Sequence, residues 1–174
     1  MSLMKKVILE KTILVAARDG FSNFPVKNVA KECGCSEGLI FHYYDTKKML
    51  VRTCYGHICD NLSDYMQSEL KGKNDFISVW KAFCDYMGRN RESALFCFGF
   101  LKSDDSTDEG LELLRDSLGG VITDEGGGQD DGRLSYLTRT LAILGCMYGS
   151  GIIRFDDGLK KDYRAIMECI LCDD

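Results

Sequence analysis

The 174-residue chain contains a single proline, Pro25, and this scarcity bears directly on the fold. Turn-rich β architectures use proline freely, so its near absence favours long, uninterrupted helices. Long apolar runs are also missing. The longest nearly uncharged run, residues 141–153, is shorter than the ~20 residues that a membrane-spanning helix requires. We therefore expect an all-α globular protein that makes no contact with a membrane.

The sequence offers little from which to build an active site. It has only two histidines, His42 and His57, and neither a nucleophile motif nor a phosphate-binding glycine loop surrounds them. Acid–base and nucleophilic catalysis need such groups in pairs. We therefore expect that the protein is not an enzyme, and we assign it no catalytic residue, metal site or cofactor. Residues 1–3, which precede a second methionine, fit an expression scar and are left out of the helix predictions. No basic segment followed by an apolar one opens the chain, so we expect a cytoplasmic protein without a secretory signal.

Cysteine, by contrast, is abundant, with nine residues in the chain. The number is odd, and the only close pairs are Cys33 with Cys35 and Cys169 with Cys172. Neither pair is followed by histidines at zinc-finger spacing. We interpret the cysteines as reduced, small hydrophobic residues of an intracellular protein. A redox or metal sensor that uses thiols is the alternative, and a thiol enzyme ranks below both.

Charge is divided unevenly along the chain. Residues 1–52 hold nine basic and five acidic side chains, a net charge of +4, whereas residues 53–174 carry a net charge of −9. A basic amino-terminal head on an acidic body predicts that only the head meets a polyanion. Local variation in surface charge would give the same counts, so this signal is weak by itself.

The first fifty residues predict three short helices and the start of a fourth. The first helix ends at Gly20, and Pro25 suits the first position of the second helix, where its missing N–H costs nothing. Gly34 ends the second helix, and Ser36 caps a third over residues 37–43. Two short helices joined by a turn containing glycine form a helix-turn-helix. The apolar stripe of the first helix includes Ile8, Thr12, Val15 and Ala16.

Residues 26–50 carry a longer pattern than a lone helix-turn-helix. Its defining positions are Val26, Val29, Ala30, Gly34, Ser36, Gly38, Ile40, Tyr43, Thr46, Lys47 and Leu50. This pattern resembles the DNA-binding domain of TetR-type transcriptional regulators, and with the first helix the resemblance covers residues 6–52. It implies an all-α chain with a helix-turn-helix DNA-binding domain in residues 4–52. A helical ligand-binding and dimerisation domain would follow in residues 53–174.

Several positions depart from the family pattern. Phe24 and Pro25 replace the threonines that usually cap the second helix and touch phosphate. Phe41 replaces the usual tyrosine, so a phenolic phosphate contact is expected to be missing. Ala16 replaces a large aromatic residue of the first helix, and Phe24 is the candidate to compensate for it.

The third helix is predicted to enter the major groove, which admits one helix. Glu37 can accept a hydrogen bond from a cytosine amino group, and Leu39 can contact a thymine methyl group. The less favoured alternatives are that Glu37 is only a first-turn carboxylate at the helix dipole and that His42 is an ordinary surface histidine. Ile40 and Phe41 are available for the core, and Tyr44 is expected in it at the position of the family's phenylalanine. The candidate DNA-binding residues are Lys27, Ser36, Glu37, Gly38, Leu39, His42, Tyr43 and Lys47, the last a phosphate contact at the start of the fourth helix.

The body is predicted to be helical throughout. A fourth helix covers residues 46–70, and an apolar stripe predicts a fifth over 76–87. In residues 95–101, phenylalanine occupies every second position, a pattern that suits a strand. No partner strand is evident, however, so we expect a buried helix. Three further helices are expected from apolar spacing: one at Leu111, Leu114 and Leu118, one at Leu134, Leu137, Leu141, Leu144 and Tyr148, and one at Leu159, Tyr163, Ile166 and Ile170. Residues 124–132 are expected to form an acidic, glycine-rich loop.

The last two helices, within residues 133–172, are predicted to form a homodimer, as the resemblance implies. Ala142, Gly145 and Gly149 form a small-residue stripe beside their leucine seam, which suits a close helix approach. The same residues can instead close an intramolecular core, and the sequence does not decide between the two.

The resemblance implies a bacterial, ligand-responsive transcriptional regulator, a repressor that binds a near-palindromic operator in double-stranded DNA as a dimer. A small-molecule effector would release it. The candidate ligand-binding residues are Trp80, Phe83, Met87, Phe96, Phe98 and Phe100. They favour an apolar effector, because a cavity with few charges cannot compensate the desolvation of an ion. Arg89, Arg91 and Lys102 are the nearby cations that can anchor a carboxylate at the rim.

Overall fold

The structure is a computed structural model of the chain, and it describes residues 2–71, 76–103, 113–114, 142, 144–147 and 151. Within this part of the chain the regular structure is entirely α-helical, as predicted. Within residues 2–71 and 76–103, six helices follow one another: α1 (Leu3–Asp19), α2 (Val26–Cys33), α3 (Glu37–Tyr44), α4 (Lys47–Leu70), α5 (Phe76–Arg89) and α6 (Arg91–Leu101).

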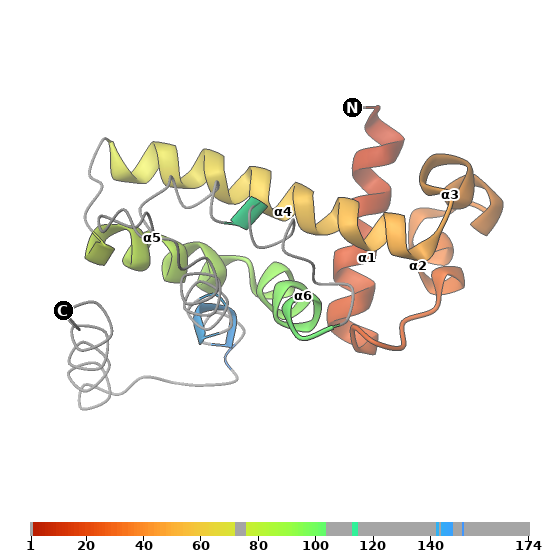
Figure 1. Cartoon of the computed structure of the whole chain (residues 1–174). Helices are drawn as coiled ribbons and strands as arrows, with labels where there is room; N and C mark the ends of the chain where they lie inside the picture. The colour runs from red at the N-terminus through yellow and green to blue at the C-terminus, as the bar shows by residue number, and fades with distance from the viewer. Residues whose placement is uncertain are drawn as a thin grey trace, which may run out of the picture.

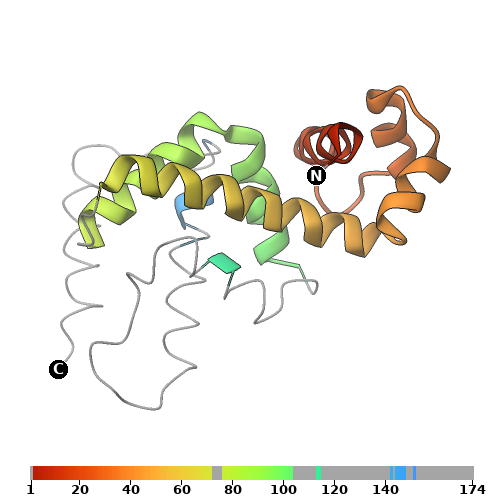
Figure 2. The same ribbon diagram turned by 90° about the horizontal axis from the view of Figure 1, so that it is seen from above.

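Helix α4 is the long axis around which the other helices are arranged. Figure 1 shows α1, α2 and α3 gathered at its amino-terminal end, with α5 and α6 along the rest of its length. The view from above, in Figure 2, gives the same separation into a head and a body. Because α4 is continuous from residue 47 to residue 70, the predicted boundary at residues 52 and 53 falls inside one helix. The head and body therefore share a rigid element instead of a flexible linker.

Side-chain caps begin three of these helices. Ser36 Oγ accepts a hydrogen bond from the Leu39 N–H at 3.2 Å, and Thr46 Oγ1 accepts one from the Met49 N–H at 3.1 Å. Ser2 caps α1 in the same way, accepting from the Lys5 N–H at 3.4 Å. Each cap satisfies one of the N–H groups that a helix start leaves without a partner. Leaving residues 1–3 out of the helix prediction was therefore wrong, because Ser2 and Leu3 define the start of α1.

The turn between α2 and α3 depends on a left-handed glycine. Gly34 has φ of 63° and ends α2, a conformation that costs glycine little because it has no Cβ. Two backbone bonds close the turn, from Gly34 N–H to the Lys31 carbonyl at 3.2 Å and from Cys35 N–H to the Ala30 carbonyl at 3.0 Å. Pro25 lies one residue earlier than predicted, immediately before α2, where its backbone is extended.

One continuous apolar core joins the head to the body. Thr12, the polar member of the α1 stripe, is fully buried, and its hydroxyl donates to the Ile8 carbonyl at 2.7 Å. This bond within the helix lets a polar side chain lie in the core. Ala16 and Phe24 are both buried in the same core.

The phenylalanine-rich segment is a helix, as predicted, and forms most of α6. Phe96 and Phe100 lie four residues apart on one face and are buried, whereas Phe98 lies on another face and is half-buried. Helical spacing thus explains the burial pattern, which strand alternation would not.

Gly145, a member of the predicted small-residue stripe, packs against α5 of the same chain. A Cβ placed there would lie 2.2 Å from Phe83 Cε1 and 3.3 Å from Trp80 Cη2, both on α5. Ala142 and Cys146 are buried as well. Of the two alternatives that the sequence left open, Gly145 therefore supports intramolecular packing.

Other predictions for the later chain lie mostly outside the described residues. Leu114 is described and buried, and Leu144 is described and half-buried. Outside the described part lie the loop 124–132 and Leu111, Leu118, Leu134, Leu137, Leu141, Tyr148, Gly149, Leu159, Tyr163, Ile166, Cys169, Ile170 and Cys172. Among the helices that are described, none is both long and apolar enough to cross a bilayer.

Candidate nucleic-acid interface

Helix α3 presents one face to the core and the opposite face to solvent. Ile40 and Tyr44, one turn apart, are buried and fix the inner face. Leu39 and Tyr43 are half-buried at the margins. The exposed face carries Glu37, Gly38, Phe41 and His42.

The exposure of Phe41 differs from the sequence prediction. The sequence makes Phe41 available for the core, but 37% of its surface is exposed. The physical reason is the helical period, because Phe41 follows the buried Ile40 and is turned about 100° away from it. The outer face of α3 is therefore more apolar than predicted.

Contacts to α1 hold the carboxyl-terminal end of α3 in place. The Tyr44 hydroxyl donates to the Lys5 carbonyl at 3.0 Å. Lys5 Nζ also lies 5.6 Å from the centre of the Tyr43 ring, within reach of a cation–π attraction. Burial raises the pKa of Tyr44 to about 12, so its hydroxyl remains a donor across the physiological range. Helix α3 is thus a fixed element whose exposed face has one orientation relative to α1.

A polar network fixes α2 against α1. Arg18 Nη1 lies 2.7 Å from Glu32 Oε1, and Arg18 Nε lies 2.7 Å from Asp19 Oδ1. Asn28 Nδ2 donates to Asp19 Oδ2 at 2.7 Å. Hydrogen bonds from Arg18 lower the pKa of both carboxyl groups. The network connects the end of α1 with both ends of α2, and so sets the direction in which the lysines of α2 project.

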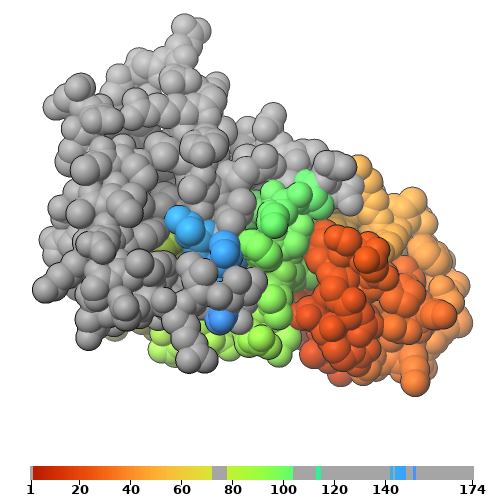
Figure 3. All heavy atoms as spheres, turned by 90° about the horizontal axis from the view of Figure 1, so that it is seen from below, coloured from red at the N-terminus to blue at the C-terminus, as the bar shows by residue number. Residues whose placement is uncertain are grey.

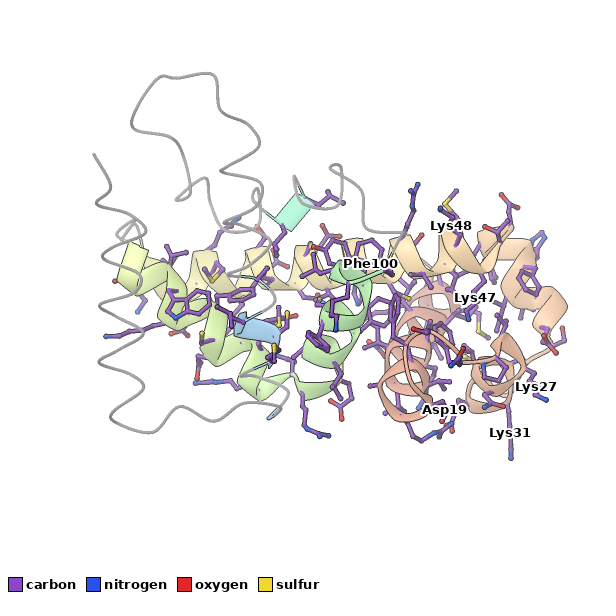
Figure 4. All side chains as sticks on the ribbon, turned by 60° about the horizontal axis from the view of Figure 1, so that its bottom comes forward. Asp19, Lys27, Lys31, Lys47, Lys48 and Phe100 are labelled. Carbon is purple, nitrogen blue, oxygen red and sulfur yellow. The ribbon has the colours of Figure 1, made fainter. Side chains whose placement is uncertain are left out.

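The lysines of the head lie in two different environments. Lys27 and Lys31 on α2 are exposed, as is Lys48 on α4, and Figure 4 shows where the three lie in the head. Lys47 is only half-buried and turns inward: its Nζ donates to the Phe24 carbonyl at 2.7 Å and lies 4.1 Å from the centre of the Phe24 ring. The residue predicted to contact phosphate at the start of α4 is therefore engaged within the protein. Ser36 is likewise engaged, as the cap of α3.

The six candidate ligand-binding residues lie in separate packing environments. Trp80 and Phe83 have ring centres 5.8 Å apart on α5, beside Gly145. Met87 is fully buried on the same helix. Phe98 lies under Lys102 Nζ, 4.9 Å from its ring centre.

The remaining two, Phe96 and Phe100, line the contact between body and head. The Phe21 ring, in the α1–α2 turn, meets Phe96 and Phe100 edge-on, with ring centres 5.1 Å and 6.4 Å apart. Phe100 also stacks on Tyr55 of α4 at 4.1 Å. We call this cluster of Phe21, Tyr55, Phe96 and Phe100 the aromatic seam.

Gly99 completes the seam, and sequence reasoning missed its role. A Cβ on Gly99 would lie 2.4 Å from both Cβ and Cγ of Phe21, so the glycine admits the phenylalanine against the backbone of α6. Figure 3 shows α6 lying directly against α1 on this side of the molecule. The only signal in the sequence was a glycine inside the phenylalanine-rich segment, and nothing there named Phe21 as its partner.

Cys33, Cys54 and Cys84 are poor candidates for reactive thiols. Burial raises the pKa of Cys33 to about 11 and that of Cys84 to about 12, and it raises the pKa of the fully buried Cys54 further. Redox-sensing thiols need a low pKa and access to solvent. Within the described part of the chain, no three His, Cys, Asp or Glu side chains gather as a metal site would require.

Comparison with known proteins finds a family model that matches the head and solved structures that share the fold of the chain. Residues 8–54 match the family model of bacterial regulatory proteins of the tetR family. A crystal structure of a TetR family transcription regulator from Marinobacter aquaeolei VT8 is similar with a TM-score of 0.64 at 18% identity, over 89% of this chain and 88% of that one. A second, described as a transcriptional regulator from Pseudomonas aeruginosa PAO1, has a TM-score of 0.59 at 20% identity, over 97% of this chain and 90% of that one. No curated protein matches the sequence. The head, residues 8–54, is thus a domain of the tetR family, in a chain with the fold of TetR-type transcription regulators.

Proposed function

We propose that the protein is a ligand-responsive transcriptional repressor whose head binds an operator in double-stranded DNA. The observation that carries the proposal is the exposed face of α3 within a head that matches the tetR family. This face projects from a domain of net charge +4, while the rest of the chain carries −9. Such a distribution attracts the head to a polyanion and repels the body.

In the proposed complex, α3 lies in the major groove. Glu37, Leu39 and His42 approach base edges, and Gly38 allows a close approach of the backbone. The exposed Phe41 adds an apolar surface suited to thymine methyl groups. Tyr43 lies at the edge of this surface, Ser36 holds the start of α3, and Lys27 on the adjacent α2 is placed for phosphate.

Two copies of the chain would bind together. A homodimer through residues 133–172 would present two heads to half-sites about one helical turn, or a multiple of it, apart. Support for this comes from the leucine seam of the sequence and from the family resemblance. Because Gly145 packs against Phe83 inside the chain, the proposed contact does not include Gly145.

The effector is proposed to be a small apolar molecule bound in the body. Trp80, Phe83, Met87 and Phe98 are the candidates outside the aromatic seam, and Arg89, Arg91 and Lys102 are the cations that can anchor a carboxylate. A ligand that prefers a body conformation with misplaced heads would lower operator affinity by linkage. The aromatic seam is the contact through which such a displacement would reach the head.

Selection of bound duplexes from a random-sequence library tests the proposed function. We expect the full chain to enrich a near-palindromic sequence and to bind it far more weakly as salt rises, because phosphate contacts release counterions. A library of single-stranded DNA is the matched control and should yield no enriched sequence. Enrichment of no duplex at low salt would contradict the proposal.

A further inference from the structure

The start of α4 is attached to the α1–α2 turn through one lysine side chain. Lys47, the first residue of α4, places its Nζ 2.7 Å from the Phe24 carbonyl oxygen and 4.1 Å from the centre of the Phe24 ring. Both distances suit strong interactions of an ammonium group, a charge-assisted hydrogen bond and a cation–π contact. One residue therefore offers the cation both an acceptor and an aromatic face.

The position of Phe24 makes this attachment firm. Phe24 is 1% exposed, and its N–H donates to the Gly20 carbonyl at 3.2 Å, so the ring and carbonyl are held by the core and the turn. On the other side, Lys47 follows Thr46, which caps α4 and is two residues from the end of α3. The contact thus spans from the α1–α2 turn to the junction between α3 and α4.

Lys48, the next residue, has surroundings that differ from those of Lys47. It is exposed, and Figure 4 shows Lys47 on the side of α4 that faces α1 and α2, with Lys48 on the opposite side. Two adjacent lysines of the head therefore have different surroundings. A lysine that served as a phosphate contact would have to leave the acceptor and the ring that the protein supplies.

We propose that Lys47 is a positioning residue for DNA binding: it holds the α3–α4 junction against Phe24 and stays there when DNA is bound. The inference rests on the proposed function, since it assigns Lys47 a part in presenting α3. It differs from the phosphate contact that the family pattern predicts for this position. The Phe24 ring, which stands where that pattern has a threonine, adds an aromatic face to the backbone acceptor.

The proton spectrum of Lys47 tests the placement directly. Ring currents shift protons over the face of an aromatic ring upfield, so the ε-methylene protons of Lys47 should be upfield of those of Lys48 in 13C-lysine-labelled protein. Phe24→Leu should abolish the shift while keeping an apolar side chain in the core. The shift should persist in the complex with a duplex recovered by selection. Loss of the shift on adding that duplex would overturn the proposal, because Lys47 would then have moved to phosphate.

The salt dependence of operator affinity is a second test that distinguishes a positioning role of Lys47 from phosphate binding. A lost phosphate contact reduces the slope of log affinity against log salt concentration by about 0.9. We expect Lys47→Met to weaken operator binding about tenfold with an unchanged slope. Phe24→Leu should weaken binding less, because it removes the ring but keeps the backbone acceptor, and the double variant should be little weaker than Lys47→Met alone. Lys81→Met, on the body, is the matched control for loss of one lysine and should not change affinity.

The outcomes distinguish this proposal from the proposed function. A reduced slope for Lys47→Met, or additive effects in the double variant, would overturn the positioning role while leaving DNA binding intact. If the wild-type chain preferred no duplex, the proposed function would fail instead. Two measurements without DNA would then decide whether the contact itself exists. One is the upfield shift of the Lys47 ε-methylene protons, and the other is the non-additivity of Lys47→Met and Phe24→Leu in thermal unfolding.

Discussion

At the scale of single residues, neighbours in sequence have opposite surroundings in the head. Ile40 is fully buried and Phe41 is exposed, while Lys47 turns inward and Lys48 outward. The sequence pattern identified Ile40 as core, because helical spacing predicts burial well. It could not identify the partner of Lys47, because the Phe24 carbonyl lies 23 residues away and backbone acceptors leave no trace in a sequence.

The contact between Gly99 and Phe21 makes a prediction at this scale. Gly99→Ala should destabilise the protein by about 1–3 kcal/mol, because the new methyl group would collide with Phe21 at a position where the core is already filled. Gly56→Ala is the matched control within α4, where an added Cβ meets nothing within 4 Å. It should stabilise the protein by up to about 1 kcal/mol through helix propensity. Denaturant unfolding measures both, and a Gly99→Ala protein as stable as the Gly56→Ala protein would contradict the seam.

At the scale of elements, the helices themselves were well predicted from sequence. Helix α4 was expected over residues 46–70 and runs from Lys47 to Leu70, and α6 is a helix as expected. Caps, glycine stops and apolar periodicity are local signals, and each acts within a few residues. The contacts between elements were not predicted, because Arg18 with Glu32 and Phe21 with Phe96 join residues that no local pattern relates.

The α1–α2 network predicts a dependence of stability on acid pH. The pKa values of Asp19 and Glu32 are lowered in the folded protein from ordinary values of 3.8 and 4.5. Their contribution is therefore present above those values and is lost as pH falls through the lower, folded pKa values. Arg18→Gln should lower the thermal midpoint near neutral pH, and the difference from wild type should shrink below about pH 4. Circular dichroism melts at several pH values measure this, and a difference that grows on acidification would contradict it.

At the scale of the whole molecule, head and body form one packed unit around α4 and the aromatic seam. The sequence separated the two parts by charge and by family resemblance, but it treated Phe96 and Phe100 only as candidate ligand contacts. In the structure these two residues contact Phe21 of the head and, through Phe100, Tyr55 of α4. Roles that depend on which helices meet need the tertiary arrangement, so the seam emerged only there.

The central claim is that the exposed face of α3 reads base sequence, and base discrimination by His42→Ala measures it most directly. The affinities of wild type and variant are compared on the selected duplex and on each of its single-base-pair changes. We expect wild type to lose about 1–3 kcal/mol for changes at contacted positions. The variant should lose that discrimination at one or two positions and keep it elsewhere, with the same salt slope. Unchanged discrimination at every position would contradict the account.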